Sequence, residues 1–291
     1  MGRNGSLAYQ VNQSIRGQIA YGHSKYQDKM NGTTGDKIYS FSTAKNYTKN
    51  ACRAMNEIKA AHPDVRTLED ARAHVGEYLQ GKIDAGLAAS SIHSYAHALG
   101  KVYGCSAKAF GVDLPQRNRS DFQRSRGDKV RDAHFSATKN AELVDFCRAT
   151  GLRREDLETL KGDALLEKDG KYFLDVQNSK GGRDRISPII GTDEQIKAVA
   201  DRCKAAGDGL VWGKVHNAAD IHGYRSDYAR DLYAQNERDI GSLPRSERYD
   251  CRNDRAGEHY DKKALQIVSE ALGHGKSDKP RYDVVISNYF R

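Results

Sequence analysis

The sequence lacks several features that would assign it to particular classes of protein. No apolar run approaches the roughly 18 residues of a transmembrane helix. The first residues, MGRNGSLAYQVNQSIRG, lack the apolar core of a signal peptide. A glycine-rich phosphate loop of the G-x-x-x-x-G-K type is also missing, so ATP use is not indicated. These absences predict a soluble, intracellular protein without a membrane partner.

Cysteine is sparse and scattered. An odd number of cysteines without any C-x-x-C spacing argues against a disulfide framework and against a structural zinc site. We therefore expect reduced thiols that pack as small apolar groups, no bound metal and no cofactor. The five residues are Cys52, Cys105, Cys147, Cys203 and Cys251.

Charge and length narrow the remaining classes. The chain has 291 residues, a length that predicts about two domains. Its net charge of +8 and pI near 9.1 favour a polyanionic partner. Electrostatics alone does not separate nucleic acid from an acidic membrane surface.

Residues 1–112 predict a bundle of about four amphipathic helices. Apolar residues recur at helical spacing in four segments, and each stripe is expected to face the core. Ser42 or Thr43 is expected to cap the second helix, and Thr67 with Asp70 resembles a capping box at the third. The stripes are Leu7, Val11, Ile15 and Ile19; Tyr47, Ala51, Met55 and Ile58; Leu68, Ala71, Val75 and Leu79; and Ile92, Tyr95, Leu99 and Val102.

A basic segment follows, and residues 113–132 read as a linker between domains. The stretch RNRSDFQRSRGDKVR carries six basic residues against two acids and has little apolar content. It could be a merely solvated connector, but we favour a strap along DNA phosphates, because flexible basic segments gain affinity by releasing counterions. The six residues are Arg117, Arg119, Arg124, Arg126, Lys129 and Arg131.

Residues 133–291 predict a second domain, mostly helical with a small antiparallel sheet. A helix capped by Ser136 and ended by Gly151 is followed by two strands around an Asp169-Gly170 turn, a strong hairpin signal. RISPII is expected to be a third strand. Helices are expected within TDEQIKAVADRCKAAG, GYRSDYARDLYAQ and KKALQIVSEALG, with a polar, loop-like insertion at about 236–262.

Four islands in this second domain could carry chemistry. They are TGLRREDLETL with Arg153, SKGGRDRISPI with Lys180, HGYR with His222 and Arg225, and LGH with His274. Each has an ordinary explanation when taken alone: a surface charge, a turn, a solvated pair and a helix end. Their order and spacing together are far more specific.

This ordered set resembles the tyrosine recombinase, or phage integrase, family. Members carry an arginine after a Thr-Gly-Leu-like stretch, a hairpin lysine in a K-G-x-x-x-R-x-x-P setting, H-x-x-R, L-G-H and a final tyrosine. The stretch IHGYRSDYARDLYAQ is especially similar to integrases of mobile elements. The stretch GLAASSIHSYAHALGKVYG resembles the SAM-like core-binding domain of the family. The implied fold is a helical DNA-binding domain followed by a mixed α/β catalytic domain.

The resemblance implies a catalytic set and a role for each member. Two arginines suit the charge that builds on a phosphodiester under attack, since a guanidinium is permanently charged and binds bidentately. The hairpin lysine is the candidate acid for the leaving oxygen, the first histidine takes the tyrosine proton, and the second binds the scissile phosphate. An acid at position 156 would support the first arginine. The set is Arg153, Lys180, His222, Arg225, His274 and a tyrosine, with Asp156 supporting.

The choice of tyrosine stays open on the sequence. The family commonly places it about nine or ten residues beyond the L-G-H histidine, whereas Tyr282 and Tyr289 follow His274 by 8 and 15 residues. DVVISNYFR resembles the closing helix of the family, with GKSDKPRY as an insertion before it, which favours Tyr289 over Tyr282. Only Phe290 and Arg291 follow Tyr289, which counts against it and puts exchange of a C-terminal tail in doubt.

The implied activity is site-specific recombination through a covalent 3′-phosphotyrosyl intermediate, for a phage or another mobile element. Such a bond stores the energy for religation, so neither ATP nor metal is needed. The implied partners are double-stranded DNA recombination sites, further copies of the chain in a tetramer, and accessory DNA-bending proteins. The implied location is the cytoplasm, on the nucleoid, in a prokaryotic or phage context. The alternatives are a non-catalytic DNA-binding relative and a DNA-relaxing enzyme of the type IB topoisomerase kind.

Overall fold

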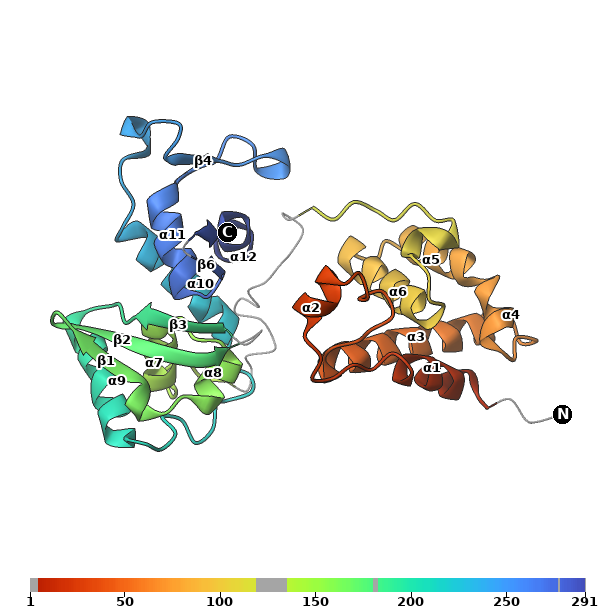
Figure 1. Cartoon of the computed structure of the whole chain (residues 1–291), viewed down its shortest axis with the longest axis horizontal. Helices are drawn as coiled ribbons and strands as arrows, with labels where there is room; N and C mark the ends of the chain where they lie inside the picture. The colour runs from red at the N-terminus through yellow and green to blue at the C-terminus, as the bar shows by residue number, and fades with distance from the viewer. Residues whose placement is uncertain (1–4, 119–134, 180–182, 277, 291) are drawn as a thin grey trace. The chain divides into compact units, whose positions relative to one another are not determined.

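The chain divides into two compact units in a computed structural model that describes residues 5–118, 135–179, 183–276 and 278–290. Unit 1 spans Met1–Arg117 and unit 2 spans Asn118–Arg291 (Figure 1). Most of the predicted linker 113–132 lies outside the described residues. No helix among the described residues is both long enough and apolar enough to cross a bilayer.

The regular secondary-structure elements described in unit 1 are helices. They are α1 (Leu7–Arg16), α2 (Lys25–Met30), α3 (Phe41–Ala61), α4 (Leu68–Arg72), α5 (Val75–Asp84), α6 (Ala89–Val102) and the 3-10 turn η1 (Ala107–Phe110). The predicted stripes of α1, α3, α5 and α6 supply most of its core, because apolar residues spaced by three or four share one helix face. Of the stripe on the first helix, Ile19 lies beyond the helix and is 41% exposed.

Local signals shift three boundaries in unit 1. Ser40, rather than Ser42 or Thr43, caps α3, and its hydroxyl accepts a hydrogen bond from the Thr43 amide. The capping box of Thr67 and Asp70 is present, but the helix that it begins stops at Arg72, and α5 starts anew at Val75. The short helix α2 was not predicted because it buries no residue, so no apolar stripe marks it.

Unit 2 contains two groups of elements. The first comprises α7 (Ala141–Thr150), α8 (Arg154–Thr159), η4 (Gly162–Ala164), β1 (Leu165–Lys168), β2 (Lys171–Ser179), β3 (Arg183–Pro188) and α9 (Asp193–Ala206). The second comprises α10 (Ile221–Ala234), η5 (Ile240–Ser242), β4 (Arg248–Asp250), η6 (Asn253–Arg255), β5 (His259–Asp261), α11 (Lys262–Ala271), β6 (Gly275–Lys276), β7 (Lys279–Pro280) and α12 (Tyr282–Tyr289). The expected fold class, mainly helical with a small antiparallel sheet, is confirmed.

The main sheet has the order β1-β2-β3 and is antiparallel throughout. Lys168 pairs with Lys171 across the predicted turn, in which Asp169 and Gly170 both have positive φ, 52° and 70°. Two such residues form the tight turn whose twist matches a hairpin. Ser136 caps a turn before α7 rather than the helix itself, which begins after Asn140 and ends at Gly151 as expected.

Two apolar cores meet in unit 2. One joins α7, α8, β2 and α9, and the other joins α10, α11 and α12. Helix α10 packs on α7, and α11 packs on β3, so the two groups form one body (Figure 1). The ends of α7, α11 and α12 therefore come together between the cores.

The insertion at 236–262 is not loop-like. Strands β4 and β5 pair in antiparallel register, with Tyr249 opposite Tyr260. Strands of three residues are too short for an alternating pattern to stand out in the sequence, which explains the missed sheet. The stretch GKSDKPRY, predicted as an insertion before the last helix, contains the two-residue strands β6 and β7.

Candidate active site

Four of the predicted positions converge where the two cores of unit 2 meet. Arg153 is the N-cap residue of α8, Arg225 lies on α10, His274 follows α11, and Tyr289 is the last residue of α12. His222 lies one turn before Arg225 on α10, and the centroid of its ring is 5.6 Å from that of Tyr289. The structure thus brings together residues that are up to 136 positions apart, from 153 to 289.

The hydroxyl of Tyr289 lies between a cation and an imidazole. Arg225 Nε donates a hydrogen bond to it at 3.0 Å, and His274 Nε2 lies 2.8 Å from it. The Tyr289 side chain is otherwise buried, with 3% of the residue exposed. A guanidinium that donates to the phenolic oxygen stabilises negative charge as it develops there.

Two backbone carbonyls hold the arginines in place. Arg225, only 2% exposed, donates from Nη2 to the Leu272 carbonyl at 2.6 Å and from Nη1 to the Gly151 carbonyl. Arg153 Nη2 donates to the same Leu272 carbonyl at 3.1 Å. One main-chain oxygen therefore links the guanidiniums of Arg153 and Arg225.

Glycine is required at position 151 by its surroundings. Its φ of +60° ends α7 in the left-handed conformation, and an added Cβ would lie 2.3 Å from the ring of Tyr228. The reversal sends the chain directly into α8, which puts Arg153 at the N-cap of that helix. The turn formed by the Thr-Gly-Leu-Arg stretch thus sets the position of Arg153.

A buried ion pair supports Arg153 from behind. Asp156 Oδ2 accepts from the Arg153 amide at 3.1 Å and from Arg185 Nη2 at 2.7 Å, and the side chains of Asp156 and Arg185 are 2% and 3% exposed. Burial by itself raises the pKa of Asp156, but the charge and hydrogen bond of Arg185 outweigh it, so the pKa lies below its usual value. Asp156 therefore stays ionised in the folded protein.

The neighbouring positive charges affect the pKa of Arg153. Burial, with the charges of Arg225 and Arg185 added, lowers the pKa of Arg153 to about 10. The guanidinium remains protonated near neutral pH, yet its charged form is disfavoured. An anion placed beside Arg153 and Arg225 would relieve that repulsion.

Sequence reasoning missed Arg185 as a member of the site. It is the arginine of the K-G-x-x-x-R-x-x-P motif, so its position in the motif was the available signal. Its Nε also donates to the Ala271 carbonyl at 3.1 Å, and Ser187 Oγ donates to that carbonyl at 2.5 Å. Arg185 and Ser187 thus fix the end of α11, just before His274.

The hairpin lysine cannot be placed, because Lys180 lies outside the described residues. Its neighbour Ser179 is buried and accepts a hydrogen bond from Arg153 Nη1 at 2.9 Å. The β2–β3 register shifts between Val176 and Ser179, and this bulge directs Ser179 towards Arg153. The end of β2 therefore reaches the cluster.

The predicted DNA-binding strap falls mostly outside the described residues as well. Arg117 is exposed at the end of unit 1. The structure describes none of Arg119, Arg124, Arg126, Lys129 and Arg131. Their binding role remains a prediction.

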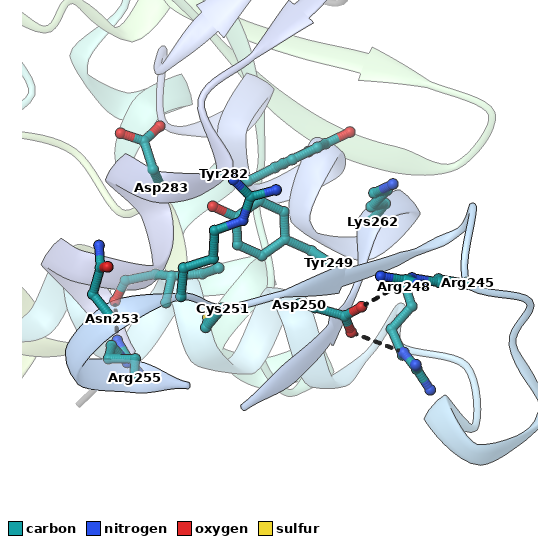
Figure 2. Close-up of a pocket in the computed structure, with 12 residues that line it drawn as sticks. Arg245, Arg248, Tyr249, Asp250, Cys251, Asn253, Arg255, Lys262, Tyr282 and Asp283 are labelled. Atoms are coloured by element: carbon teal, nitrogen blue, oxygen red, sulfur yellow. Dashed lines mark hydrogen bonds and ion pairs between the residues drawn. The ribbon is translucent and has the colours of Figure 1, made fainter. Parts of the chain in front are cut away.

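Tyr282 is in a different environment from Tyr289. It is the first residue of α12, and its ring meets that of Tyr249 edge to face, with centroids 5.6 Å apart. It lines a cavity of about 850 Å³ together with residues of the insertion (Figure 2). Burial raises the pKa of Tyr282. Seven residues of helix, roughly 10 Å along its axis, separate it from Tyr289.

The cysteines and one histidine pair bear on metal binding. Burial raises the pKa of Cys147 to about 12 and that of Cys203 to about 11, so these thiols stay protonated. In unit 1, Glu77 Oε2 lies 3.2 Å from His62 Nε2 and 3.7 Å from His74 Nδ1. The two imidazole rings stack, with their centroids 3.6 Å apart and an angle of 20° between their planes. The Glu77 carboxylate thus lies within ion-pairing distance of both imidazoles.

Comparisons with known proteins bear on the fold. The sequence matches no protein-family model and no curated protein. The structure is similar to the XerH site-specific recombinase bound to a palindromic difH substrate, with a TM-score of 0.53, 13% identity, and coverage of 97% of this chain and 91% of that one.

Two further similarities are more distant. The Tn1549 transposon integrase in complex with transposon right-end DNA has a TM-score of 0.43 and 13% identity, with coverage of 98% of this chain and 95% of that one. The XerA recombinase has a TM-score of 0.34 and 15% identity, with coverage of 98% and 94%. The fold assignment therefore rests on XerH and on the elements described above. The chain has the fold of the tyrosine recombinases.

Proposed function

We propose that this chain cleaves and rejoins DNA strands, with Tyr289 as the nucleophile. The observation that carries the proposal is the position of the Tyr289 hydroxyl, 3.0 Å from Arg225 Nε and 2.8 Å from His274 Nε2. Arg153, linked to Arg225 through the Leu272 carbonyl, supplies a second guanidinium beside the same point. In this proposal, Tyr289 is the nucleophile, an imidazole accepts its proton, and Arg153 and Arg225 bind the phosphate.

The first step is a phosphoryl transfer. The Tyr289 oxygen attacks the scissile phosphorus, the new O–P bond leaves a 3′-phosphotyrosyl link, and the bond to the 5′ oxygen breaks. Arg153 and Arg225 bind the non-bridging oxygens, whose charge grows in the transition state. Removal of one such donor typically costs about 10²–10³ in rate.

The proton of Tyr289 needs an acceptor. A neutral phenol is a much weaker nucleophile than a phenolate, so proton removal has to accompany attack. The sequence favours His222 for this role, but His274 is the imidazole within hydrogen-bonding distance of the hydroxyl. We propose His274 as the acceptor, with His222 packed beside the tyrosine ring.

The leaving oxygen needs a proton in return. Lys180, at the tip of the β2–β3 hairpin in the sequence, is the candidate donor. The 5′ hydroxyl of a new strand then attacks the phosphotyrosine, reverses the transfers and frees Tyr289. No external energy source enters, because the covalent link conserves the energy of the broken bond.

The partners follow from this chemistry. Exchange between two duplexes needs paired recombination sites and several active sites, so we propose a tetramer of this chain on DNA, with DNA-bending proteins as accessories. The DNA substrate bound in the structure of XerH supports a DNA substrate for this chain. The basic strap from Arg117 to Arg131 would follow the phosphates.

A covalent-trapping assay tests the proposal. Nicked suicide duplexes are tiled across the DNA that adjoins the gene, and protein–DNA adducts are detected on denaturing gels. We expect an adduct with the wild-type chain and with Tyr282→Phe, and none with Tyr289→Phe. His274→Ala is expected to slow adduct formation more than His222→Ala.

Each other outcome assigns a different function. Tight DNA binding without any adduct would identify a non-catalytic DNA-binding relative. Relaxation of supercoiled DNA that lacks any specific site would identify an enzyme of the type IB topoisomerase kind. An adduct that persists in Tyr289→Phe and disappears in Tyr282→Phe would move the nucleophile to the start of α12.

A further inference from the structure

The insertion at residues 236–262 contacts the helix that carries Tyr289. Arg255, at the end of η6, donates a hydrogen bond from Nη1 to the Ile286 carbonyl of α12 at 2.9 Å. Ile286 lies one turn before Tyr289, and its carbonyl also accepts from the Phe290 amide at 3.2 Å. A carbonyl oxygen has two lone pairs, so it can accept from Arg255 as well as from the Phe290 amide, and a cationic donor from outside the helix stabilises its last turn.

The Arg255 side chain is itself fixed. Its Nε donates to both carboxylate oxygens of Glu258, at 2.8 and 2.9 Å, and its Nη2 donates to the Tyr260 hydroxyl at 2.9 Å. That hydroxyl in turn donates to Glu258 Oε2 at 2.7 Å. A planar guanidinium held on three sides has little freedom, so the position of Nη1 is set by the insertion.

Aromatic packing joins the same parts a second time. The ring of Tyr260, on β5, lies 5.5 Å from that of Phe290, the residue after Tyr289. Tyr233 of α10 packs against both rings, at 5.8 Å from Tyr260 and 5.0 Å from Phe290. The insertion therefore holds α12 on both sides of Tyr289 in sequence.

The two ends of α12 are held differently. At its last turn, Arg230 of α10 donates to the Tyr289 carbonyl at 3.2 Å, so two arginines from separate elements bind adjacent turns of backbone. At its first turn, Tyr282 and Asp283 border the cavity of about 850 Å³ (Figure 2). Tyr249 meets Tyr282 there through its ring edge. The contacts from Arg255 and Arg230 thus lie at the end that carries Tyr289.

We propose that Arg255 is a positioning residue, through which the insertion sets the register of α12 and thereby the place of the Tyr289 hydroxyl. The inference rests on the proposed function and assigns the insertion a role within it. Arg255 touches neither Arg225 nor His274 among its described hydrogen bonds and acts through the Ile286 carbonyl. Displacement of a reacting group by about 1 Å can cost roughly 100-fold in rate.

The test compares Arg255→Met and Arg255→Lys with the wild-type chain. On the nicked duplex that gives the strongest wild-type adduct, we expect the rate constant of adduct formation at saturating DNA to fall about 10- to 100-fold in both variants. The dissociation constant for the duplex is expected to stay within about twofold. Lysine keeps the charge but replaces a planar fork by one ammonium, so it cannot keep all the bonds of Arg255.

Arg252→Met is the matched control. Arg252 is exposed in the same insertion, lines the same cavity, and has no hydrogen bond to α12 among the described residues. We expect a wild-type rate. Glu258→Gln, which leaves Arg255 in place but weakens its anchor, is expected to lower the rate several-fold and serves if the Arg255 variants do not fold.

A second readout does not depend on activity. Hydrogen exchange of the peptide that covers residues 282–290 is expected to accelerate in Arg255→Met, because the Phe290 amide shares the Ile286 carbonyl with Arg255. Equal exchange and an unchanged adduct rate would overturn the inference. A wild-type adduct rate in Arg255→Lys would also overturn the inference, because it would show that only the positive charge of Arg255 matters. If the wild-type chain forms no adduct, the proposed function fails, and exchange alone decides whether the insertion holds α12.

Discussion

Asp156 shows at the scale of one residue how an acid can serve a site made of cations. Its carboxylate neutralises Arg185, which in turn binds the end of α11, and it fixes the amide of Arg153. The first turn of a helix favours an acid in any protein, so the sequence alone leaves two interpretations of this residue open. Its burial and its pairing with Arg185 support the proposal that it holds the cluster in place.

Asp156→Asn is expected to destabilise the fold. The substitution leaves the guanidinium of Arg185, 3% exposed, without its charge partner. Breaking a buried pair in this way costs about 3–5 kcal/mol of unfolding free energy. Urea denaturation measures it, with Glu155→Gln, an exposed neighbour on α8, as a control that should stay within about 0.5 kcal/mol. A decrease below about 1 kcal/mol would contradict the support role.

The same residue predicts a pH dependence. Because the folded pKa of Asp156 is below the unfolded value of about 3.9, its contribution is fully present above that pH and is lost as the pH falls through the folded pKa. We expect the acid destabilisation of the wild type below about pH 4 to be shallower in Asp156→Asn. Parallel curves for the two proteins would show that other carboxylates account for it.

At the scale of elements, Asp261 joins the insertion to α11. It caps α11 by accepting from the Lys263 amide at 2.8 Å, and its two oxygens bind Arg238 at 2.7 and 2.8 Å. Hydrogen bonds from Arg238, which outweigh burial, lower the pKa of Asp261 to about 2. One buried carboxylate thus ends the insertion and begins the helix that leads to His274.

Asp261→Asn is expected to loosen the insertion without unfolding the unit. Trypsin should cleave after Arg245, which is 90% exposed, several-fold faster in this variant at neutral pH. In the wild type the Asp261 carboxylate contributes fully above about pH 4, and this contribution is lost as the pH falls towards 2. Asp239→Asn, at the cap of η5, is the control. Equal cleavage of all three proteins would contradict the role of Asp261.

The sequence predicts elements where periodicity or turn chemistry is strong. The stripes of α3 and α6 and the Asp169-Gly170 turn are examples, because each depends on neighbours along the chain. Helix α2 and the β4–β5 sheet are too short or too polar to leave such a pattern. Their form depends on tertiary contacts such as Arg238 with Asp261, which no local window contains.

The site divides in the same way. Arg153, Arg225 and His274 are recognisable because side chains of special type stand in a special order. Arg185 was missed as a site member, since arginine is common and its partner Asp156 lies 29 positions away. The preference for Tyr289 over Tyr282 came from local similarity, and the hydrogen bonds of its hydroxyl now support it as the proposed nucleophile.

At the scale of the whole molecule, the net charge of the chain favours a polyanionic partner. The chain carries a net charge of +8, and its most basic short segment runs from Arg117 to Arg131. A strap of this kind would add affinity without adding sequence preference, because phosphates are the same at every site. We therefore expect its contribution to depend on salt.

A triple substitution of Arg119, Arg124 and Arg126 by Gln tests the strap. Each arginine–phosphate pair that is removed should reduce the slope of log K against log salt concentration by about 0.9, so a reduction of up to about 3 is expected, with weaker binding at low salt. Titrations with a labelled duplex at several salt concentrations measure it. Gln at Lys168, Lys197 and Lys214, all exposed in unit 2, is the control. An unchanged slope would show that these arginines do not bind phosphates and would favour the interpretation of the segment as a solvated connector.

The carbonyl of Leu272 has a consequence for how such a site can change over generations. It belongs to the main chain and receives both Arg153 and Arg225. Any amino acid at position 272 supplies the same oxygen, so mutation there is filtered by packing of the side chain and not by the spacing of the two guanidiniums. Substitutions at position 272 that pack well should therefore keep the separation between Arg153 and Arg225, because that separation depends on the course of the backbone and not on the side chain of residue 272.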